Sequence, residues 1–302
     1  MPQAETPTAQ FEITPKGPYS LDAAARFLAG FSPLGGTRSA HDAHVHLAFV
    51  VDGTDEAVGV CLQQQGETVV GEIAGTADPG AVSAQVARIL SLDVDGTRYA
   101  EIGERDPVIG EIQARFPGLR PVSFYSPFEA GAWALISQRV QMAQAAKVKA
   151  RMAQELGQEV DIHGDRVHTF PPPARLLELT GYPGLFGRKV EYLRGLADAA
   201  LDGRLDADYL RDLSPEEALA ALRRIPGVGD FSARLILLRG AAIPDGPPAP
   251  EPHVLQALQL AYGLEGPLSE AELERLTEGW RPFRTWVTFL LRVMLQEERR
   301  PA

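Results

Sequence analysis

The chain has 302 residues, of which 45% are hydrophobic and 23% are charged, a composition that suits a globular protein of about two domains. No apolar run reaches the roughly 18 residues that span a bilayer, and the first residues lack the pattern of a secretory signal. The single cysteine, Cys61, excludes an intrachain disulfide and a four-thiolate zinc or iron–sulfur site. We therefore expect a cytoplasmic monomer without a membrane partner.

The net charge of −11 argues at first against a nucleic-acid partner, because phosphates attract Lys and Arg. The charge is unevenly distributed, however. Residues 1–110 contain 6 Lys and Arg against 15 Asp and Glu, whereas residues 111–302 contain 23 against 25. The acidity belongs mostly to the first third of the chain, so the total charge does not decide the partner.

The N-terminal third predicts an α+β module. The polar residues 1–15 are typical of a flexible arm. Ser20 is placed to cap a helix over residues 20–31, and a second helix is predicted over residues 79–92. Between them lie β-type runs over residues 44–51, 57–64 and 67–75. Residues 16–116 are therefore expected to form an α+β domain with an antiparallel sheet.

The remainder, residues 117–302, is expected to be all-α. Three helix starts there share a Ser cap followed by an acid at the third helical position: Ser126, Ser214 and Ser269. Other helices are predicted over residues 141–156, 173–180, 187–202, 253–263 and 281–298. The expected fold class is thus an N-terminal α+β antiparallel-sheet module followed by a mostly α-helical region.

The most informative stretch is AALRRIPGVGDFSARLILLRG, residues 220–240. The helix that starts at Ser214 must end before Pro226, and a second helix begins near Phe231. The connection predicts a helical hairpin with a tight, glycine-containing turn.

Two glycines, Gly227 and Gly229, flank Val228 in that turn. They leave backbone N–H groups bare at a helix N-terminus, where the dipole favours an anion such as a phosphate. A dinucleotide fingerprint fits less well, because it needs a preceding strand and here a helical pattern precedes the glycines. A plain helix–turn–helix corner remains the structural alternative.

This hairpin resembles the helix-hairpin-helix of the DNA base-excision glycosylase superfamily. More specifically, the chain resembles the bacterial 3-methyladenine DNA glycosylase II family over roughly residues 18–298. The resemblance is carried by the hairpin, by the N-terminal module and by residues 116–157, 186–205 and 278–295. It implies a helix-hairpin-helix glycosylase region over residues 117–302.

The resemblance implies a DNA N-glycosylase that excises alkylated purines from damaged double-stranded DNA in base excision repair. Such enzymes flip the target base out of the stack, and a carboxylate assists hydrolysis of the N-glycosidic bond. Counting from the hairpin places the family's catalytic aspartate at Glu251, which carries one extra methylene. Capping of the helix near His253 is the alternative role for Glu251, and Asp245 and His253 are candidate helpers.

The base pocket is expected to include Phe231, whose ring can stack on a flipped base. Leu235 and Arg292 stand where the family would have further aromatic residues, and Phe124 and Tyr125 are additional candidates. Phe231 also stands where bifunctional relatives carry a Schiff-base lysine. The resemblance therefore implies a monofunctional hydrolase.

DNA contacts are expected from three places. Gln138 and Arg139 occupy the helix bend that carries the family's intercalating wedge, with a solvated arginine as the alternative. The turn residues Gly227, Val228 and Gly229 are expected to hold a phosphate. Further phosphate contacts are expected from Arg234, Lys147, Lys149 and Arg188.

The resemblance implies one ion and no other cofactor. A monovalent cation, Na⁺ or K⁺, is expected on the backbone carbonyls of Arg223, Ile225 and Val228. Asp230, next to the turn, is expected to cap the second hairpin helix. His163 and His168 lack a third ligand, so a metal site there is rejected.

Two rival functions remain open from the sequence. One is a catalytically weak or inactive DNA-damage-binding protein on the same fold, suggested by Glu251 and by the few aromatic residues of the pocket. The other is a helical scaffold that binds protein partners and not DNA.

Overall fold

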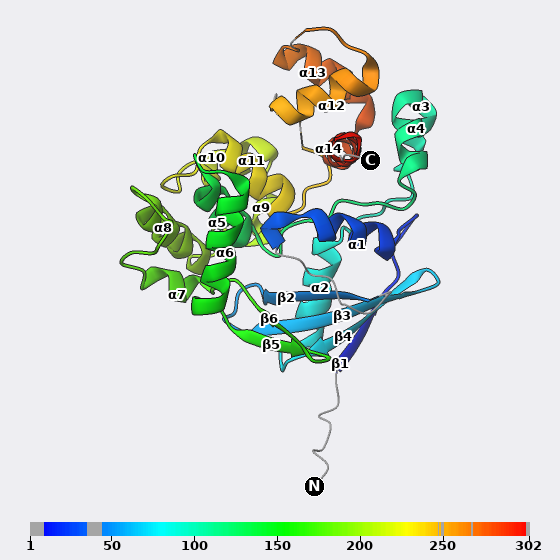
Figure 1. Cartoon of the computed structure of the whole chain (residues 1–302). Helices are drawn as coiled ribbons and strands as arrows, with labels where there is room; N and C mark the ends of the chain where they lie inside the picture. Colours follow the sequence, from blue (N-terminus) through cyan, green and yellow to red (C-terminus); the bar gives the residue numbers. More distant parts are fainter. Residues whose placement is uncertain (1–8, 35–43, 247, 249–250, 267, 300–302) are drawn as a thin grey trace.

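The computed structural model describes residues 9–34, 44–246, 248, 251–266 and 268–299 (Figure 1). Its N-terminal part contains a four-stranded antiparallel sheet in the order β1-β4-β3-β2. The strands are β1 (Ala9–Ile13), β2 (Val45–Val50), β3 (Ala57–Gln65) and β4 (Thr68–Ala74). The expected antiparallel sheet is thus confirmed.

The arm expected over residues 1–15 is wrong for residues 9–13. These residues form β1, which pairs with β4 so that Phe11 lies opposite Gly71. The alternation of AQFEI is short, and its partner strand lies more than 50 residues further along the chain. The strand is therefore decided by a long-range pairing.

One face of the sheet packs on two helices, α1 (Leu21–Gly30) and α2 (Pro79–Ile89). Ser20 caps α1 by accepting from the N–H of Ala23, as its position predicted, and Asp78 caps α2. A short 3₁₀ turn, η1 (Ser32–Leu34), follows α1. The shared core is made of alternate strand residues such as Leu47, Val60 and Leu62.

The rest of the described chain is mostly helical, as expected. Ser126, Ser214 and Ser269 all cap helices, and the last two form complete capping boxes. The first helices of this region are α5 (Pro127–Ser137), α6 (Met142–Leu156), α7 (Pro173–Leu177), α8 (Lys189–Leu201) and α9 (Ala207–Asp212). They are followed by α10 (Pro215–Leu222), α11 (Asp230–Leu235), η2 (Ile236–Gly240), α12 (Pro252–Tyr262), α13 (Glu270–Thr277), η3 (Glu278–Trp280) and α14 (Arg284–Glu298). Among the described residues, no helix has the length and apolar character needed to cross a membrane.

The expectation of an all-α region over residues 117–302 is corrected by a two-stranded hairpin, β5 (Glu159–Ile162) and β6 (Asp165–His168). This hairpin lies over the outer face of the sheet, next to β3 (Figure 1). Gly59 of β3 makes room for it, because a Cβ at that position would lie 2.5 Å from the Ile162 side chain. Both faces of β3 are therefore buried.

Two further helices, α3 (Ala100–Arg105) and α4 (Pro107–Arg115), are absent from the sequence-based expectation. They fall within the segment 16–116 but stand beside α14, away from the sheet (Figure 1). A second core forms there around Trp280 and Trp286. These two helices therefore contribute to the second core, through Ile102, Ile109 and Ile112.

Arg120 joins these parts. Its guanidinium is buried and donates five hydrogen bonds to backbone carbonyls, those of Lys16, Gly17, Pro18, Ser91 and Val94, at 2.5 to 3.1 Å. It also lies 5.3 Å from the ring centroid of Trp286 in the second core. Burial lowers the pKa of this arginine.

We expect Arg120→Met to lower the free energy of unfolding by about 3 to 5 kcal/mol, because five buried or partly buried hydrogen bonds to backbone carbonyls are lost. Urea denaturation measures the effect. Arg115→Ala is the control, since its pair with Glu298 at 2.8 Å is half exposed and worth less than about 1 kcal/mol. Equal losses in the two variants would contradict a structural role of Arg120.

Candidate active site and nucleic-acid interface

The helical hairpin is formed by α10 and α11, and α11 continues without a break into the π-helical turn η2. Gly227 in the turn has φ of +84°, and a Cβ there would lie 2.5 Å from the Tyr192 ring. Val228 is buried. Gly229 is the N-cap of α11, and no side chain accepts a hydrogen bond in that cap. The turn has the backbone geometry that suits an anion.

Asp230 does not cap α11, contrary to expectation. Its carboxylate instead accepts a hydrogen bond from Arg223 at 2.8 Å across the hairpin. The carbonyl of Ile225 accepts from the N–H of Val228 at 3.1 Å, which closes the turn. The monovalent cation on the carbonyls of Arg223, Ile225 and Val228 stays a prediction.

Glu251 lies at a small cavity of about 50 Å³ between the second hairpin helix and α14. It is the N-cap residue of α12, but its side chain makes no capping hydrogen bond. Its Oε2 lies 3.7 Å from Nη1 of Arg292, and the carboxylate is one quarter exposed. The cavity is lined by Arg234, Leu235, Leu238, Arg239, Gly246, Pro248, Glu251, Val254, Thr285, Thr288, Phe289 and Arg292. The Glu251 carboxylate thus faces this cavity.

Arg239 is a cavity residue that sequence reasoning missed. Its guanidinium lies between the rings of Phe27, Phe31 and Phe289, with centroids 5.0 to 5.8 Å away. Burial, together with the charge of Arg292, lowers the pKa of Arg239 to about 9, so it stays protonated at neutral pH. Its position depends on aromatic residues from distant segments, so no local pattern signals it.

The expected base-pocket residues are only partly brought together. Leu235 and Arg292 line the cavity with Glu251. Phe231 is 55% exposed on α11 and is not among the lining residues. Phe124 and Tyr125 are buried in the main core, against Phe31 and Phe49 respectively.

The two candidate helpers, Asp245 and His253, are not among the residues that line the cavity. Asp245 binds buried Arg284 through two side-chain hydrogen bonds at 2.8 and 3.0 Å, and it also accepts from Arg281 at 3.0 Å. These contacts tie Asp245 to the start of α14. His253 is exposed on the first turn of α12.

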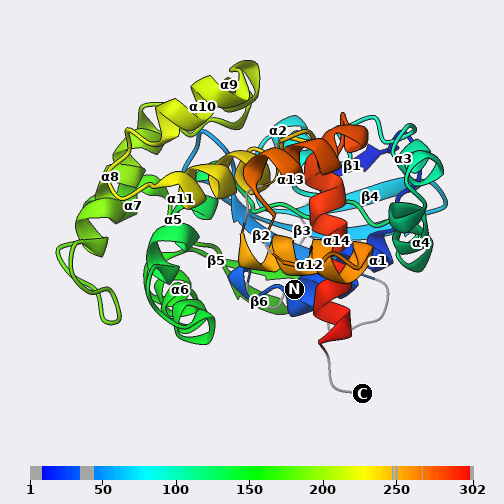
Figure 2. The same ribbon diagram turned by 90° about the horizontal axis from the view of Figure 1, so that it is seen from above.

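The bend between α5 and α6 lies beside the hairpin turn. Gln138 donates a hydrogen bond from Nε2 to the carbonyl of Gly227 at 3.0 Å. Arg139 is exposed and has φ of +54°, in the left-handed region that non-glycine residues rarely occupy. The hydrogen bond therefore joins the bend to the hairpin turn, and Figure 2 shows α5 and α6 beside α11 from above.

The other proposed phosphate contacts need one correction. Lys149 is buried and pairs with Glu129 at 2.5 Å, so it does not face solvent. Arg188 is exposed and binds Glu191 at 2.7 Å. Lys147 is exposed on α6, and Arg234 lines the cavity next to Glu251.

No protein-family model matches the chain. A DNA-3-methyladenine glycosylase of Bacillus subtilis is 24% identical over 206 residues, which cover 67% of this chain and 68% of that protein. DNA-3-methyladenine glycosylase 2 of Escherichia coli is 32% identical over 185 residues, covering 59% of this chain and 61% of that protein. The match thus spans about two thirds of the length of either relative.

Among solved structures, the 3-methyladenine DNA-glycosylase of Archaeoglobus fulgidus aligns with a TM-score of 0.75 and 23% identity, covering 96% of this chain and 99% of that one. An 8-oxoguanine glycosylase/lyase of Clostridium acetobutylicum, in complex with double-stranded DNA, aligns with a TM-score of 0.62 and 19% identity, covering 84% and 86%. The protein thus has the fold of the helix-hairpin-helix DNA glycosylases. The resemblance to the bacterial 3-methyladenine DNA glycosylase II family, expected from the sequence, is confirmed by the curated relatives.

The contacts of Asp245 and Glu251 predict effects of different size on stability when either carboxylate is replaced. Asp245→Ala leaves buried Arg284 without its partner, and we expect a loss of about 3 kcal/mol in the free energy of unfolding. Glu251→Gln keeps the size of the side chain at a partly exposed position, and we expect a change within about 0.5 kcal/mol. Thermal and urea denaturation test both, and a larger loss for Glu251→Gln would reverse these structural roles.

Proposed function

We propose that this protein is a DNA N-glycosylase that removes alkylated purines of the 3-methyladenine class in base excision repair. One observation carries the proposal: Glu251 faces a cavity beside the helix that begins at the hairpin turn, and the α5–α6 bend is bonded to that turn. A carboxylate, a backbone anion site and an exposed wedge residue are the parts that such a reaction needs.

The relatives support this function. The chain is similar to two bacterial proteins named as DNA-3-methyladenine glycosylases. It also shares its fold with a glycosylase/lyase whose structure contains double-stranded DNA. We infer from these names that the substrate is damaged DNA, and from the geometry which residues contact it.

In the proposed mechanism the damaged nucleotide rotates out of the duplex toward the Glu251 cavity, because its glycosidic bond is unreachable inside the stack. The purine leaves with the electrons of the bond to C1′, and positive charge develops on the sugar. The Glu251 carboxylate stabilises that charge and accepts a proton from the water that adds to C1′. The products are the free base and an abasic site.

Side chains must move before a base can enter. The cavity volume of about 50 Å³ is well below the roughly 300 Å³ of common ligand pockets. Arg292, which lies 3.7 Å from the carboxylate, also opposes an alkylated purine that carries positive charge. We infer that the Glu251–Arg292 pair separates when the nucleotide enters, so that the carboxylate faces the sugar.

The DNA backbone is held with few basic side chains in this proposal. The N–H groups at the start of α11 bind one phosphate, and Arg234 adds a positive charge on the same helix. Arg139 enters the gap left by the flipped nucleotide, where its guanidinium stacks on the opposite base. This small electrostatic contact suits a chain with a net charge of −11.

We further propose a monofunctional hydrolase. Phe231 stands at the hairpin position of the lyase lysine, and the cavity lining contains no lysine. In the described chain, Lys149 and Lys189 are buried and bonded to Glu129 and to the carbonyl of Ile136. These contacts support the proposal that no lysine at the Glu251 cavity forms a Schiff base with the sugar.

We expect Glu251→Gln to reduce release of 3-methyladenine from methylated DNA by at least about 100-fold, because the charge opposite the developing cation is lost. Release of free base is measured by chromatography. The control is Glu265→Gln, which makes the same change from carboxylate to carboxamide at an exposed position just beyond α12. We expect this variant to keep wild-type activity.

Different results would contradict the enzymatic function and the assignment of Glu251 as the catalytic carboxylate. Absence of base release by the wild-type protein, for 3-methyladenine and 7-methylguanine alike, would contradict the enzymatic function and favour damage binding alone. Full activity of Glu251→Gln would contradict only the assignment of the catalytic carboxylate.

We expect Arg139→Ala to weaken binding to a duplex that contains an abasic-site analogue by about tenfold, the size of one lost stacking contact. Binding to an undamaged duplex should change little. Fluorescence anisotropy at several salt concentrations measures both affinities. Arg151→Ala, at an exposed position further along α6, is the matched control. Equal losses in the two variants would indicate general electrostatics and not a wedge.

A further inference from the structure

The outer face of the sheet contains a row of polar residues that the proposed function does not use. His46 of β2 pairs directly with Cys61 of β3, and Cys61 pairs directly with Glu72 of β4. Directly paired residues share one face of an antiparallel sheet. His46 and Cys61 are 5% and 2% exposed, because the β5–β6 hairpin covers this face. The burial of an imidazole next to a thiol calls for a structural or functional explanation.

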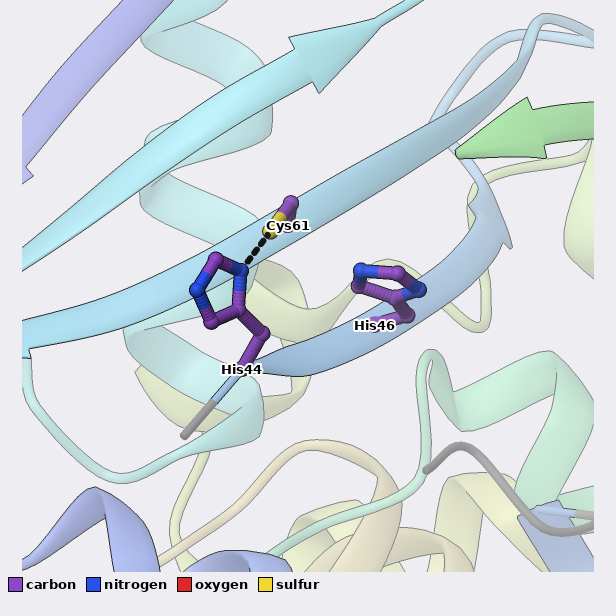
Figure 3. A group of neighbouring side chains, drawn as sticks. All are labelled: His44, His46 and Cys61. Atoms are coloured by element: carbon purple, nitrogen blue, oxygen red, sulfur yellow. Dashed lines mark hydrogen bonds between the residues drawn. The ribbon is translucent and has the colours of Figure 1, made fainter. Parts of the chain in front are cut away.

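His44 completes a group of three potential ligands. It lies two residues before His46, and its Nδ1 is 3.2 Å from Sγ of Cys61. One ligand atom from each of the three side chains lies within 4.8 Å of the others. Figure 3 shows the two imidazoles at the start of β2 and the thiol of Cys61 in the middle of the neighbouring strand β3.

These distances are close to those of a metal centre. With Zn–N near 2.0 Å and Zn–S near 2.3 Å, tetrahedral ligand atoms lie about 3.3 to 3.6 Å apart. The thiol–imidazole distance of 3.2 Å is just below that range, and the other ligand-atom separations are at most 4.8 Å. Nitrogen and sulfur donors favour zinc and similar transition metals over magnesium or calcium.

The residues around His44 and His46 also suit a role of these imidazoles as metal ligands. Asp165, on β6, lies 3.1 Å from Nδ1 of His46, the carboxylate–histidine arrangement that orients metal-binding imidazoles through their second nitrogen. The amide nitrogen of Gln63 lies 3.3 Å from Nδ1 of His44, and this contact must open when that nitrogen binds an ion. The ring of His163, from the hairpin turn, stacks on His46 with centroids 6.0 Å apart.

A redox or nucleophilic role fits the Cys61 thiol less well than metal binding does. Cys61 is only 2% exposed under the β5–β6 hairpin, so its sulfur is out of reach of solvent and of a substrate. A bound cation would displace the thiol proton, as metals do at cysteine ligands.

We propose that His44, His46 and Cys61 form a binding site for one divalent transition-metal ion of the zinc class, with water at the fourth position. Asp165 positions His46 from the hairpin, so the bound ion fastens β5–β6 to the sheet. The site is independent of the glycosylase proposal, because none of its residues lines the Glu251 cavity. The HVH pattern and the single cysteine were available in the sequence, but only strand pairing brings them together.

The test uses the full chain, stripped of metal with a chelator, loaded with one equivalent of Co²⁺ or Zn²⁺ and desalted. We expect about one ion per chain by mass spectrometry, and a thiolate-to-cobalt charge-transfer band with Co²⁺. Cys61→Ser is expected to lose the band and most of the bound metal. Asp165→Asn, a positioning variant, is expected to bind 10- to 100-fold more weakly while keeping the band.

His168→Gln is the control, since it lies on the same hairpin but outside the three-residue group; it should bind metal like the wild type. If circular dichroism shows that Cys61→Ser is unfolded, His44→Gln replaces it, because His44 precedes β2 and is only half-buried. Wild-type protein that retains no metal overturns the proposal. So does undiminished metal in a folded Cys61→Ser or His44→Gln variant.

Discussion

The structure depends on the burial of one guanidinium, that of Arg120. Its N–H groups donate to backbone carbonyls of the segment after β1 and of residues that follow α2. The guanidinium also lies over the ring of Trp286. A buried arginine needs its donors satisfied, so these segments can pack only in one arrangement. Trp286 belongs to α14, whose first residue, Arg284, binds Asp245, and Arg292 of the same helix lies 3.7 Å from the Glu251 carboxylate. The sheet and the candidate carboxylate are connected through this series of contacts.

Local charge at the candidate site differs from the charge of the whole chain. The protein carries a net charge of −11, yet Arg234, Arg239 and Arg292 surround Glu251 at the cavity. Aromatic rings partly replace water around Arg239, which reduces the cost of burying its charge. The acidic residues of the first third therefore do not set the potential at the site. A backbone anion site in the hairpin further reduces the number of basic side chains that DNA binding requires.

Elements whose causes are local could be predicted from the sequence. Ser126, Ser214 and Ser269 begin helices because their side chains bond within the next turn. Elements with distant causes were missed: β1 needs β4, the β5–β6 hairpin needs the space left by Gly59, and α3 and α4 need α14. Family resemblance directed attention to Glu251, but the role of Asp245 as the partner of Arg284 appears only in the packed structure.

The sequence by itself determined the antiparallel sheet, the succession of capped helices and the helical hairpin, because alternation, capping and glycine turns act between near neighbours. Tertiary structure decided which side chains meet. Glu251 reaches Arg292 across 41 positions of the chain, and His46 meets Cys61 only through the register of β2 and β3. Such contacts depend on chain segments folding back on one another, so their chemistry becomes visible only when the cores that hold them are formed.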